Sequence, residues 1–194
     1  MPSLYKYESK REDNTNALRY CPAIVWLTGL SGAGKTTVAQ SVVSRLKQNG
    51  QNAVMLDGDQ LRKGLNRDLS FSAADRHESV RRAAETARLM AGAGLIVLVA
   101  LISPYRAGRD AARRVSEDIP FLEVFVDTPQ EVCEARDTKG LYAKARSGLI
   151  RNFTGITDPY EIPENPDLVI NTTIQSIDQS TINLLEKIYD FLNF

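Results

Sequence analysis

Cysteine, histidine and long apolar runs are scarce in this sequence. The 194 residues include two cysteines, Cys21 and Cys133, and one histidine, with no CxxC or Cys/His cluster. The pattern excludes a disulfide framework and a zinc site of the usual spacing. It predicts two reduced thiols, with a redox switch as the alternative. The longest apolar run, residues 95–102, is far too short to span a bilayer.

Charge of one sign is also lacking. Lys+Arg and Asp+Glu number 24 each, so the formal net charge is zero. A balanced chain has no global field directed at a nucleic acid or an anionic membrane, and we expect neither as a partner. Residues 1–20 are polar and lack the apolar segment of a signal peptide, which predicts a flexible N-terminal arm and a cytoplasmic location. The remaining length, residues 21–194, suits a single domain.

Short apolar runs alternate with helical patterns over this domain. We expect strands at residues 23–28, 53–56, 95–101, 121–126 and 168–170, and helices at about 35–47, 73–91, 106–117, 131–136 and 176–194. The alternation predicts an α/β fold, a three-layer sandwich in which helices cover both faces of a mostly parallel sheet. Ligands bind such sheets at the carboxyl ends of the strands.

A complete phosphate-binding P-loop, the Walker A motif, lies between the first strand and the first helix. It reads Gly-Leu-Ser-Gly-Ala-Gly-Lys-Thr at residues 29–36. Its glycines allow backbone N–H groups to converge on one anion, and the helix that follows adds its positive end. Lys35 neutralises the β- and γ-phosphates of ATP, and the Thr36 hydroxyl is a Mg²⁺ ligand. The motif therefore predicts a kinase or another enzyme that uses ATP.

Two carboxylates follow the second strand, in the sequence Asp57-Gly58-Asp59. Phosphoryl transfer needs a positioned metal and a positioned nucleophile. We expect Asp57 to support Mg²⁺ or receive a hydroxyl proton, and Asp59 to orient the substrate. The alternative is a turn in which Asp59 caps a short helix.

Arginines are the next candidates, because a guanidinium group binds phosphate or sulfate with two hydrogen bonds. Arg62 and Arg76 lie near strand ends, and we expect both to contact a ligand. Arg82 and Arg88 fit a solvated helix face better, and His77 fits a surface position.

A segment rich in Gly, Pro, Lys and Arg, residues 137–166, has no strong core periodicity. It predicts a lid or a long loop at the active site. Its basic groups suit a transferring phosphoryl charge, and its aromatic rings suit a purine. The alternative is a solvated charged loop. The basic and aromatic residues concerned are Arg136, Lys139, Lys144, Arg146, Arg151, Phe153 and Tyr160.

Taken together, the motifs resemble the adenylyl-sulfate kinase (APS kinase) family of P-loop kinases over residues 24–167. The segments that carry the resemblance are GLSGAGKTT, LDGDQLRKGLNRDLSFS, DRHESVRR, LISPYR, FVDTPQEVCEARDTKGLYAKAR and FTGITDPYEIPENPD. The resemblance implies a P-loop nucleoside-kinase-like fold with a mobile lid. It also implies transfer of the ATP γ-phosphoryl group to the 3′-hydroxyl of adenosine 5′-phosphosulfate (APS), which gives PAPS and ADP in sulfate assimilation. Mg²⁺ and a homodimer are implied with it.

The same resemblance assigns roles to individual residues. Catalytic roles fall to Lys35, Asp57 and Ser103, and Mg²⁺ ligation falls to Thr36 and Asp57. The implied ATP-binding residues are Gly29, Ser31, Gly32, Ala33, Gly34, Lys35, Thr36, Thr37 and Arg136. The implied APS-binding residues are Asp59, Arg62, Phe71, Arg76, Ser79, Ile102, Ser103, Lys139, Asn152 and Phe153. Phe71 and Phe153 are expected to enclose the adenine ring.

Three positions qualify the resemblance. The serine of the family's ISP motif, here Ser103, is often described as a phosphoserine intermediate. Direct in-line transfer needs no covalent step, so we expect Ser103 to position APS instead. Many members have Asn where this chain has Gln60 and Ser79. The shorter Ser79 predicts that one acceptor contact is lost or passes through water.

Two alternatives to this function remain open. One is a related kinase that acts on another nucleotide with a charged 5′ group, for which the altered Ser79 leaves room. The other is a nucleotide-binding regulator without catalysis. Such regulators usually lose the Walker lysine or the catalytic carboxylate, whereas Lys35, Thr36 and Asp57 are all present.

Overall fold

The computed structural model describes residues 21–192, so the arm predicted for residues 1–20 lies outside the described residues. Five strands form one parallel sheet in the order β2-β3-β1-β4-β5. They are β1 (Ala23–Thr28), β2 (Ala53–Asp57), β3 (Ile96–Ala100), β4 (Phe121–Val126) and β5 (Leu168–Ile170). The helices are α1 (Lys35–Gln48), α2 (Gly58–Lys63), α3 (Ala73–Gly92), α4 (Arg106–Val115), α5 (Gln130–Arg136), α6 (Leu141–Arg146) and α7 (Ile177–Leu192). The predicted α/β fold and its strands are confirmed.

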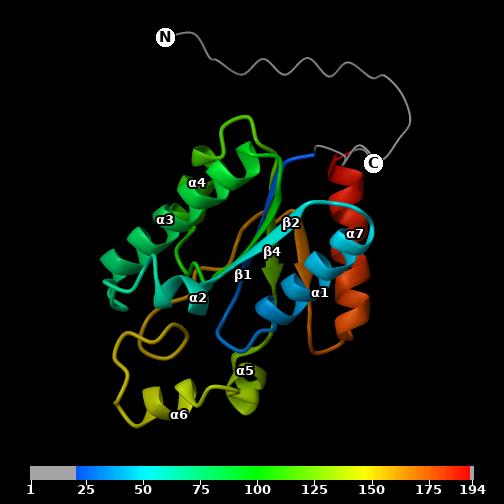
Figure 1. Ribbon diagram of the computed structural model, residues 1–194. Helices are drawn as coiled ribbons and strands as arrows, with labels where there is room; N and C mark the ends of the chain where they lie inside the picture. The colour runs from blue at the N-terminus through cyan, green and yellow to red at the C-terminus, as the bar shows by residue number, and fades with distance from the viewer. Residues whose placement is uncertain (1–20, 193–194) are drawn as a thin grey trace, which may run out of the picture.

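The sheet lies between two helical layers (Figure 1), with α1 and α7 packed together on one face and α3 and α4 on the other. Strand β1 shows why two cores form from one apolar run. Its side chains alternate in direction, so Val25 and Leu27 join the core under α1 and α7, whereas Ile24 and Trp26 join the core under α3 and α4. A strand buried on both faces needs no polar alternation.

Helix boundaries follow local capping chemistry. Ser72 caps α3, because its hydroxyl accepts a hydrogen bond from the backbone N–H of Asp75 at 3.1 Å. At α2 the cap is Asp57, whose side chain accepts from the backbone N–H groups of Asp59 and Gln60. The alternative prediction named Asp59 as the helix cap, and it is wrong because the cap is Asp57.

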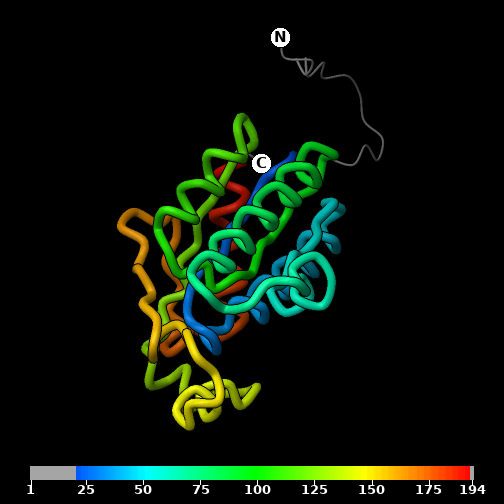
Figure 2. Tube along the Cα trace, turned by 90° about the vertical axis from the view of Figure 1, so that its left-hand side faces the viewer, coloured from blue at the N-terminus to red at the C-terminus, as the bar shows by residue number. Residues whose placement is uncertain are grey.

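The segment at residues 137–166 is more ordered than the sequence suggests. It contains helix α6 and an isolated bridge between Thr154 and Asp158. Tyr142 and Phe153 are buried and their rings meet edge to face, with centroids 4.9 Å apart. Periodicity missed this packing because the apolar residues are few and the helix spans six residues. Figure 2 shows the segment projecting beyond the body of the molecule at the end where the P-loop turns.

The parallel arrangement brings the polar segments to one edge. The carboxyl ends of β1, β2 and β3 are adjacent, and they lead into the P-loop, Asp57 and the Ile102–Ser103 turn, respectively. Within residues 21–192, no helix is long and apolar enough to cross a membrane.

Candidate active site

The P-loop has the backbone shape of an anion cradle. Gly29, Gly32 and Gly34 have φ angles of 148°, 79° and 102°, in a region that side chains disfavour. A Cβ at Gly29 would also lie 2.6 Å from the carbonyl oxygen of Val126. Glycine at position 29 therefore serves both the turn and the close approach of β4.

Lys35 lies over this loop. Its Nζ donates to the carbonyl oxygens of Gly29 at 2.9 Å and Leu30 at 2.7 Å. Burial lowers the pKa of Lys35 to about 8, and the nearby charge of Asp57 raises it in part. Among residues 21–192 this ammonium group has two carbonyl oxygens but no carboxylate in direct contact. A phosphate in the cradle supplies an anionic partner and favours the charged form of Lys35.

The P-loop and the second strand meet at one hydrogen bond. The Thr36 hydroxyl donates to Asp57 Oδ2 at 2.7 Å. The other oxygen, Oδ1, is fixed by the backbone N–H groups of Asp59 at 2.9 Å and Gln60 at 3.2 Å. A hydroxyl and a carboxylate oxygen are hard donors of the type Mg²⁺ prefers, and Mg²⁺ sites typically use one or two protein ligands with phosphate and water. This pair therefore fits a magnesium ion.

Arg62 and Arg76 surround one aromatic ring. The guanidinium carbons of Arg62 and Arg76 lie 4.1 Å and 5.6 Å, respectively, from the ring centroid of Phe71, which is 43% exposed. Arg76 also donates to the backbone oxygens of Phe71 at 3.1 Å and Asn152 at 2.7 Å. Asn152 has a φ of 57°, so its carbonyl is presented by an unusual backbone conformation.

These two arginines differ from others nearby in lacking an acidic partner. Among residues 21–192, neither Arg62 nor Arg76 forms an ion pair with a carboxylate, whereas Arg81 and Arg82 both pair with Glu78. Burial lowers the pKa of both Arg62 and Arg76, and the charge of Arg62 lowers that of Arg76 further. Two partly buried cations beside an exposed ring form a site for an anion joined to a flat base.

Arg82 lies on the outer face of α3, where it pairs with Glu78 and with Asp68 and donates to the carbonyl of Leu65 at 2.8 Å. It therefore ties the loop before α3 to the helix. His77 is exposed, as expected, and stacks on Tyr105 with ring centroids 4.9 Å apart.

The predicted acceptor residue Ser79 is buried beside a residue that the prediction omitted. Asn66 Nδ2 donates to Ser79 Oγ at 2.9 Å. Asn66 is 1% exposed, and its Oδ1 has no hydrogen-bond partner among residues 21–192. Many family members have an amide side chain at the position of Ser79, and here Asn66 places its amide next to Ser79. Asn66 is the last residue of the segment RKGLN, but sequence reasoning assigned it no role.

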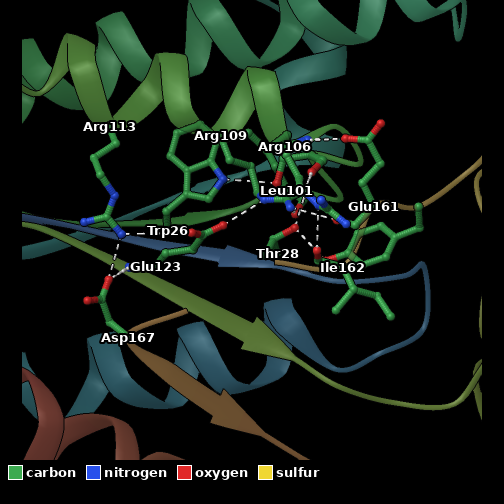
Figure 3. A network of polar contacts seen from close by, with 12 residues as sticks. Trp26, Thr28, Leu101, Arg106, Arg109, Arg113, Glu123, Glu161, Ile162 and Asp167 are labelled. Atoms are coloured by element: carbon green, nitrogen blue, oxygen red, sulfur yellow. Dashed lines mark hydrogen bonds and ion pairs between the residues drawn. The ribbon is translucent and has the colours of Figure 1, made fainter. Parts of the chain in front are cut away.

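Ser103 is held by its neighbours. It is 3% exposed and has a φ of 40°. Its Oγ accepts from the indole N–H of Trp26 at 3.0 Å, and its carbonyl accepts from Arg109 at 2.8 Å (Figure 3). The Ile102 carbonyl accepts from the Thr28 hydroxyl at 2.8 Å. This turn therefore has a fixed backbone at the end of β3.

Several lid residues contact the body. Lys139 Nζ and Asp59 Oδ2 form an ion pair between the lid and α2. The hydroxyl of Tyr142, which sequence reasoning missed, donates to the carbonyl of Ser31 at 3.0 Å. Tyr160, considered for purine stacking, instead bonds Thr28 through its hydroxyl at 2.9 Å. Phe153 is only 6% exposed, so it presents little ring surface for the predicted adenine contact.

Side chains that follow β4 and β5 also hydrogen-bond the backbone of the P-loop. Thr128 and Thr172 both donate to the carbonyl of Ala33, at 3.1 Å and 3.0 Å. Arg136, a predicted ATP residue, donates to Thr172 Oγ1 at 2.9 Å and to the Gly32 carbonyl at 3.3 Å. Nothing in the sequence marks Thr172, which simply follows the last strand. Thr37 is exposed on α1.

The fold and the site together define a P-loop kinase. The family model for adenylylsulphate kinase matches residues 21–171. The chain belongs to the adenylylsulphate kinase family.

Curated relatives share this similarity. The chain is 49% identical over 169 residues to an adenylyl-sulfate kinase of Geotalea daltonii, covering 87% of this chain and 83% of that protein. It is 53% identical over 175 residues to the bifunctional enzyme NodQ of Azospirillum brasilense, covering 90% of this chain but only 28% of that enzyme. The chain thus spans about a quarter of the length of the bifunctional relatives it matches.

A solved structure shows the same fold. It is the Mycobacterium tuberculosis APS kinase CysC in complex with AMPPNP and APS, with a TM-score of 0.84 and 50% sequence identity. The match covers 87% of this chain and 98% of that one.

We predict that Gly29→Ala weakens ATP binding by about tenfold or more, since about 1.4 kcal/mol of strain is sufficient for that factor. The new methyl group meets the Val126 carbonyl oxygen at 2.6 Å and displaces the loop. Gly50→Ala is the matched control, because Gly50 also has a positive φ, 77°, but its Cβ meets nothing within 4 Å. Titration with a fluorescent ATP analogue measures both variants. Equal affinities for the two would contradict the steric role of Gly29.

Proposed function

We propose that this chain is an adenylyl-sulfate kinase that transfers the γ-phosphoryl group of ATP to the 3′-hydroxyl of APS, giving PAPS and ADP. The observation that carries the proposal is a pair of arginines, Arg62 and Arg76, beside the exposed ring of Phe71. Neither forms an ion pair with a carboxylate among residues 21–192. This set suits an acceptor that combines an adenine ring with a phosphosulfate anion. Arg62 lies on α2, the helix capped by Asp57, whose carboxylate contacts the P-loop threonine.

Donor binding rests on the P-loop. Its backbone N–H groups and the start of α1 hold the triphosphate, and Lys35 moves from the carbonyls of Gly29 and Leu30 to the phosphate oxygens. Arg136 approaches the same loop from α5. When Mg²⁺ is bound by Thr36 and Asp57, it neutralises phosphate charge.

Asp57 has two separable tasks. Its Oδ1 is held by the N-terminus of α2, which fixes the carboxylate as an anion in one orientation. Its Oδ2 accepts from the Thr36 hydroxyl and is the oxygen that we propose for Mg²⁺ or for the 3′-hydroxyl proton. Ser103 takes no covalent part in this proposal. Its hydroxyl is buried against Trp26, and its backbone positions the acceptor.

The other acceptor contacts, the homodimer and the cytoplasmic location remain predictions. Ser79 lies with Asn66, so the proposed acceptor contact at this point is made by the pair rather than by Ser79 alone. Lys139 and Asp59 link the lid to α2, and we propose that this link closes over the bound nucleotide.

The proposed activity is tested by a coupled assay of ADP release with APS, AMP and other 5′-substituted nucleotides as acceptors. We expect strong preference for APS, because its 5′ group presents two anionic centres to Arg62 and Arg76. Similar rates with AMP would favour the related kinase for another nucleotide. ATP binding without turnover on any acceptor would favour a regulator.

Replacing Asp57 tests its two tasks separately. Asp57→Asn keeps an oxygen for the N–H groups of Asp59 and Gln60 but removes the charge, so we expect turnover to fall by about 100-fold or more while the fold is retained. Asp57→Ala also removes the helix cap, at a cost of about 1 kcal/mol in stability. APS binding should persist in both variants. Asp110→Asn, at an exposed position on α4, is the control, and near-normal turnover of the Asp57 variants would refute the assignment.

Arg62→Ala tests the acceptor site. We expect APS affinity to fall by about 10- to 100-fold, because a charge-assisted hydrogen bond is lost, while ATP affinity changes little. Isothermal titration with APS and with an ATP analogue measures both. The control is Arg67→Ala, at an exposed position in the same loop region. Equal losses for the two ligands would mark Arg62 as a structural residue.

A further inference from the structure

Arg109 is a buried charge that the proposed reaction does not yet use. It lies on α4 and is 2% exposed. Its three guanidinium nitrogens bond three different segments (Figure 3). Nε donates to Glu123 Oε1 at 2.7 Å, Nη1 donates to the Ser103 carbonyl at 2.8 Å, and Nη2 donates to the Glu161 carbonyl at 2.7 Å.

The geometry requires an arginine. A planar fork reaches three acceptors at fixed angles, which a lysine ammonium on a flexible stem does not reproduce. Glu123, on β4, supplies the compensating charge and is itself only 13% exposed. A buried pair of this kind is costly to desolvate and is therefore poor evidence for stability alone. The role of Arg109 is better sought in the two segments that its Nη1 and Nη2 atoms bond, the Ser103 turn and residue 161.

One nitrogen holds the turn after β3. Ser103 has a φ of 40°, a backbone conformation that a non-glycine residue adopts only when its surroundings enforce it. Arg109 fixes its carbonyl and Trp26 fixes its hydroxyl. The turn that is proposed to position APS is thus held from two sides.

The other nitrogen holds the C-terminal base of the lid, residues 160–162. Further bonds join this base to the same turn: the Glu161 N–H donates to the Pro104 carbonyl at 2.8 Å, and the backbone N–H of Arg106 donates to Glu161 Oε2 at 2.7 Å. The Tyr160 ring centroid lies 5.9 Å from the Arg109 guanidinium carbon. Arg109 therefore stands where the lid base and the acceptor turn meet.

We propose that Arg109 is a positioning residue that couples the base of the lid to the Ser103 turn and thereby sets the acceptor site. It acts through these two segments and touches neither substrate. The effect on APS rests on the proposed function. The coupling between the lid base and the Ser103 turn is independent of the proposed function.

The test removes both buried charges together, because removing Arg109 alone leaves Glu123 with only a long contact to Arg113. The variant is Arg109→Met with Glu123→Gln. The matched control is Arg113→Met on the same helix. Arg113 bonds Asp167 at 2.8 Å and approaches Glu123 at 3.9 Å, but it contacts neither the Ser103 turn nor the lid base. Arg109→Lys is a second variant, which keeps the charge and loses the fork.

With APS and ATP as substrates, we expect the double variant to raise the KM for APS by about tenfold or more while the KM for ATP stays within about twofold, because only the acceptor turn is displaced. Arg113→Met should leave both constants unchanged. Arg109→Lys should give an intermediate KM for APS. If the double variant does not fold, Arg109→Lys alone decides. Equal changes in both KM values, or none, overturn the proposal.

Two measurements need no substrate and separate this proposal from the proposed function. Trp26 is the single tryptophan and bonds Ser103, so its emission reports on the turn. We expect the Arg109 variants, but not Arg113→Met, to speed amide hydrogen exchange at residues 160–162. The Arg109 variants should also shift the Trp26 emission. The control for emission is Arg114→Met, at an exposed position on α4, because Arg113 lies over the Phe121 ring that stacks on Trp26. If wild-type protein does not phosphorylate APS, the proposed function fails, yet these two signals still decide the coupling. Unchanged emission and exchange overturn it.

Discussion

The hydrogen bond between Thr36 and Asp57 is the contact on which the rest of the site depends. It joins the β1–P-loop–α1 unit to the β2–α2 unit at the carboxyl ends of their strands, which β3 separates in the sheet. Because Asp57 is also the cap of α2, the same carboxylate orients the helix that carries Arg62. The P-loop and the α2 helix that carries Arg62 are therefore set relative to each other by one side chain with two fixed oxygens.

Electrostatic asymmetry complements this arrangement. Several arginines of α3 and α4 have carboxylate partners, and Arg82 and Arg113 use theirs to tie loops to the body. Arg62 and Arg76 are left without one among the described residues, and Lys35 meets only carbonyl dipoles in direct contact. Three cations without a directly bonded carboxylate among the described residues thus lie near one end of the sheet, in a protein with no net charge. A local field of this kind recruits anions without making the whole surface attractive to nucleic acid.

The strands and the P-loop could be predicted from the sequence because their signals are local. Periodicity located β4 and β5 at the residues observed, whereas the cap of α2 is Asp57 instead of Asp59. The packing of Tyr142 was not predictable, because its partner Phe153 lies eleven positions away in a segment without periodicity. The pairing of Asn66 with Ser79 and the three-way bonding of Arg109 are likewise tertiary. They depend on contacts between elements that no local pattern encodes.

The buried aromatic pair at the lid has an energetic consequence for access. Tyr142 and Phe153 belong to the same apolar cluster as the core under α1, so an outward swing of the segment transfers their rings into water. Exposure of large apolar side chains costs about 1.5–3 kcal/mol each. An open form of this segment is then a minor population. A ligand that enters only through the open form would associate at a rate set by how often the segment opens, so this packing would limit the association rate.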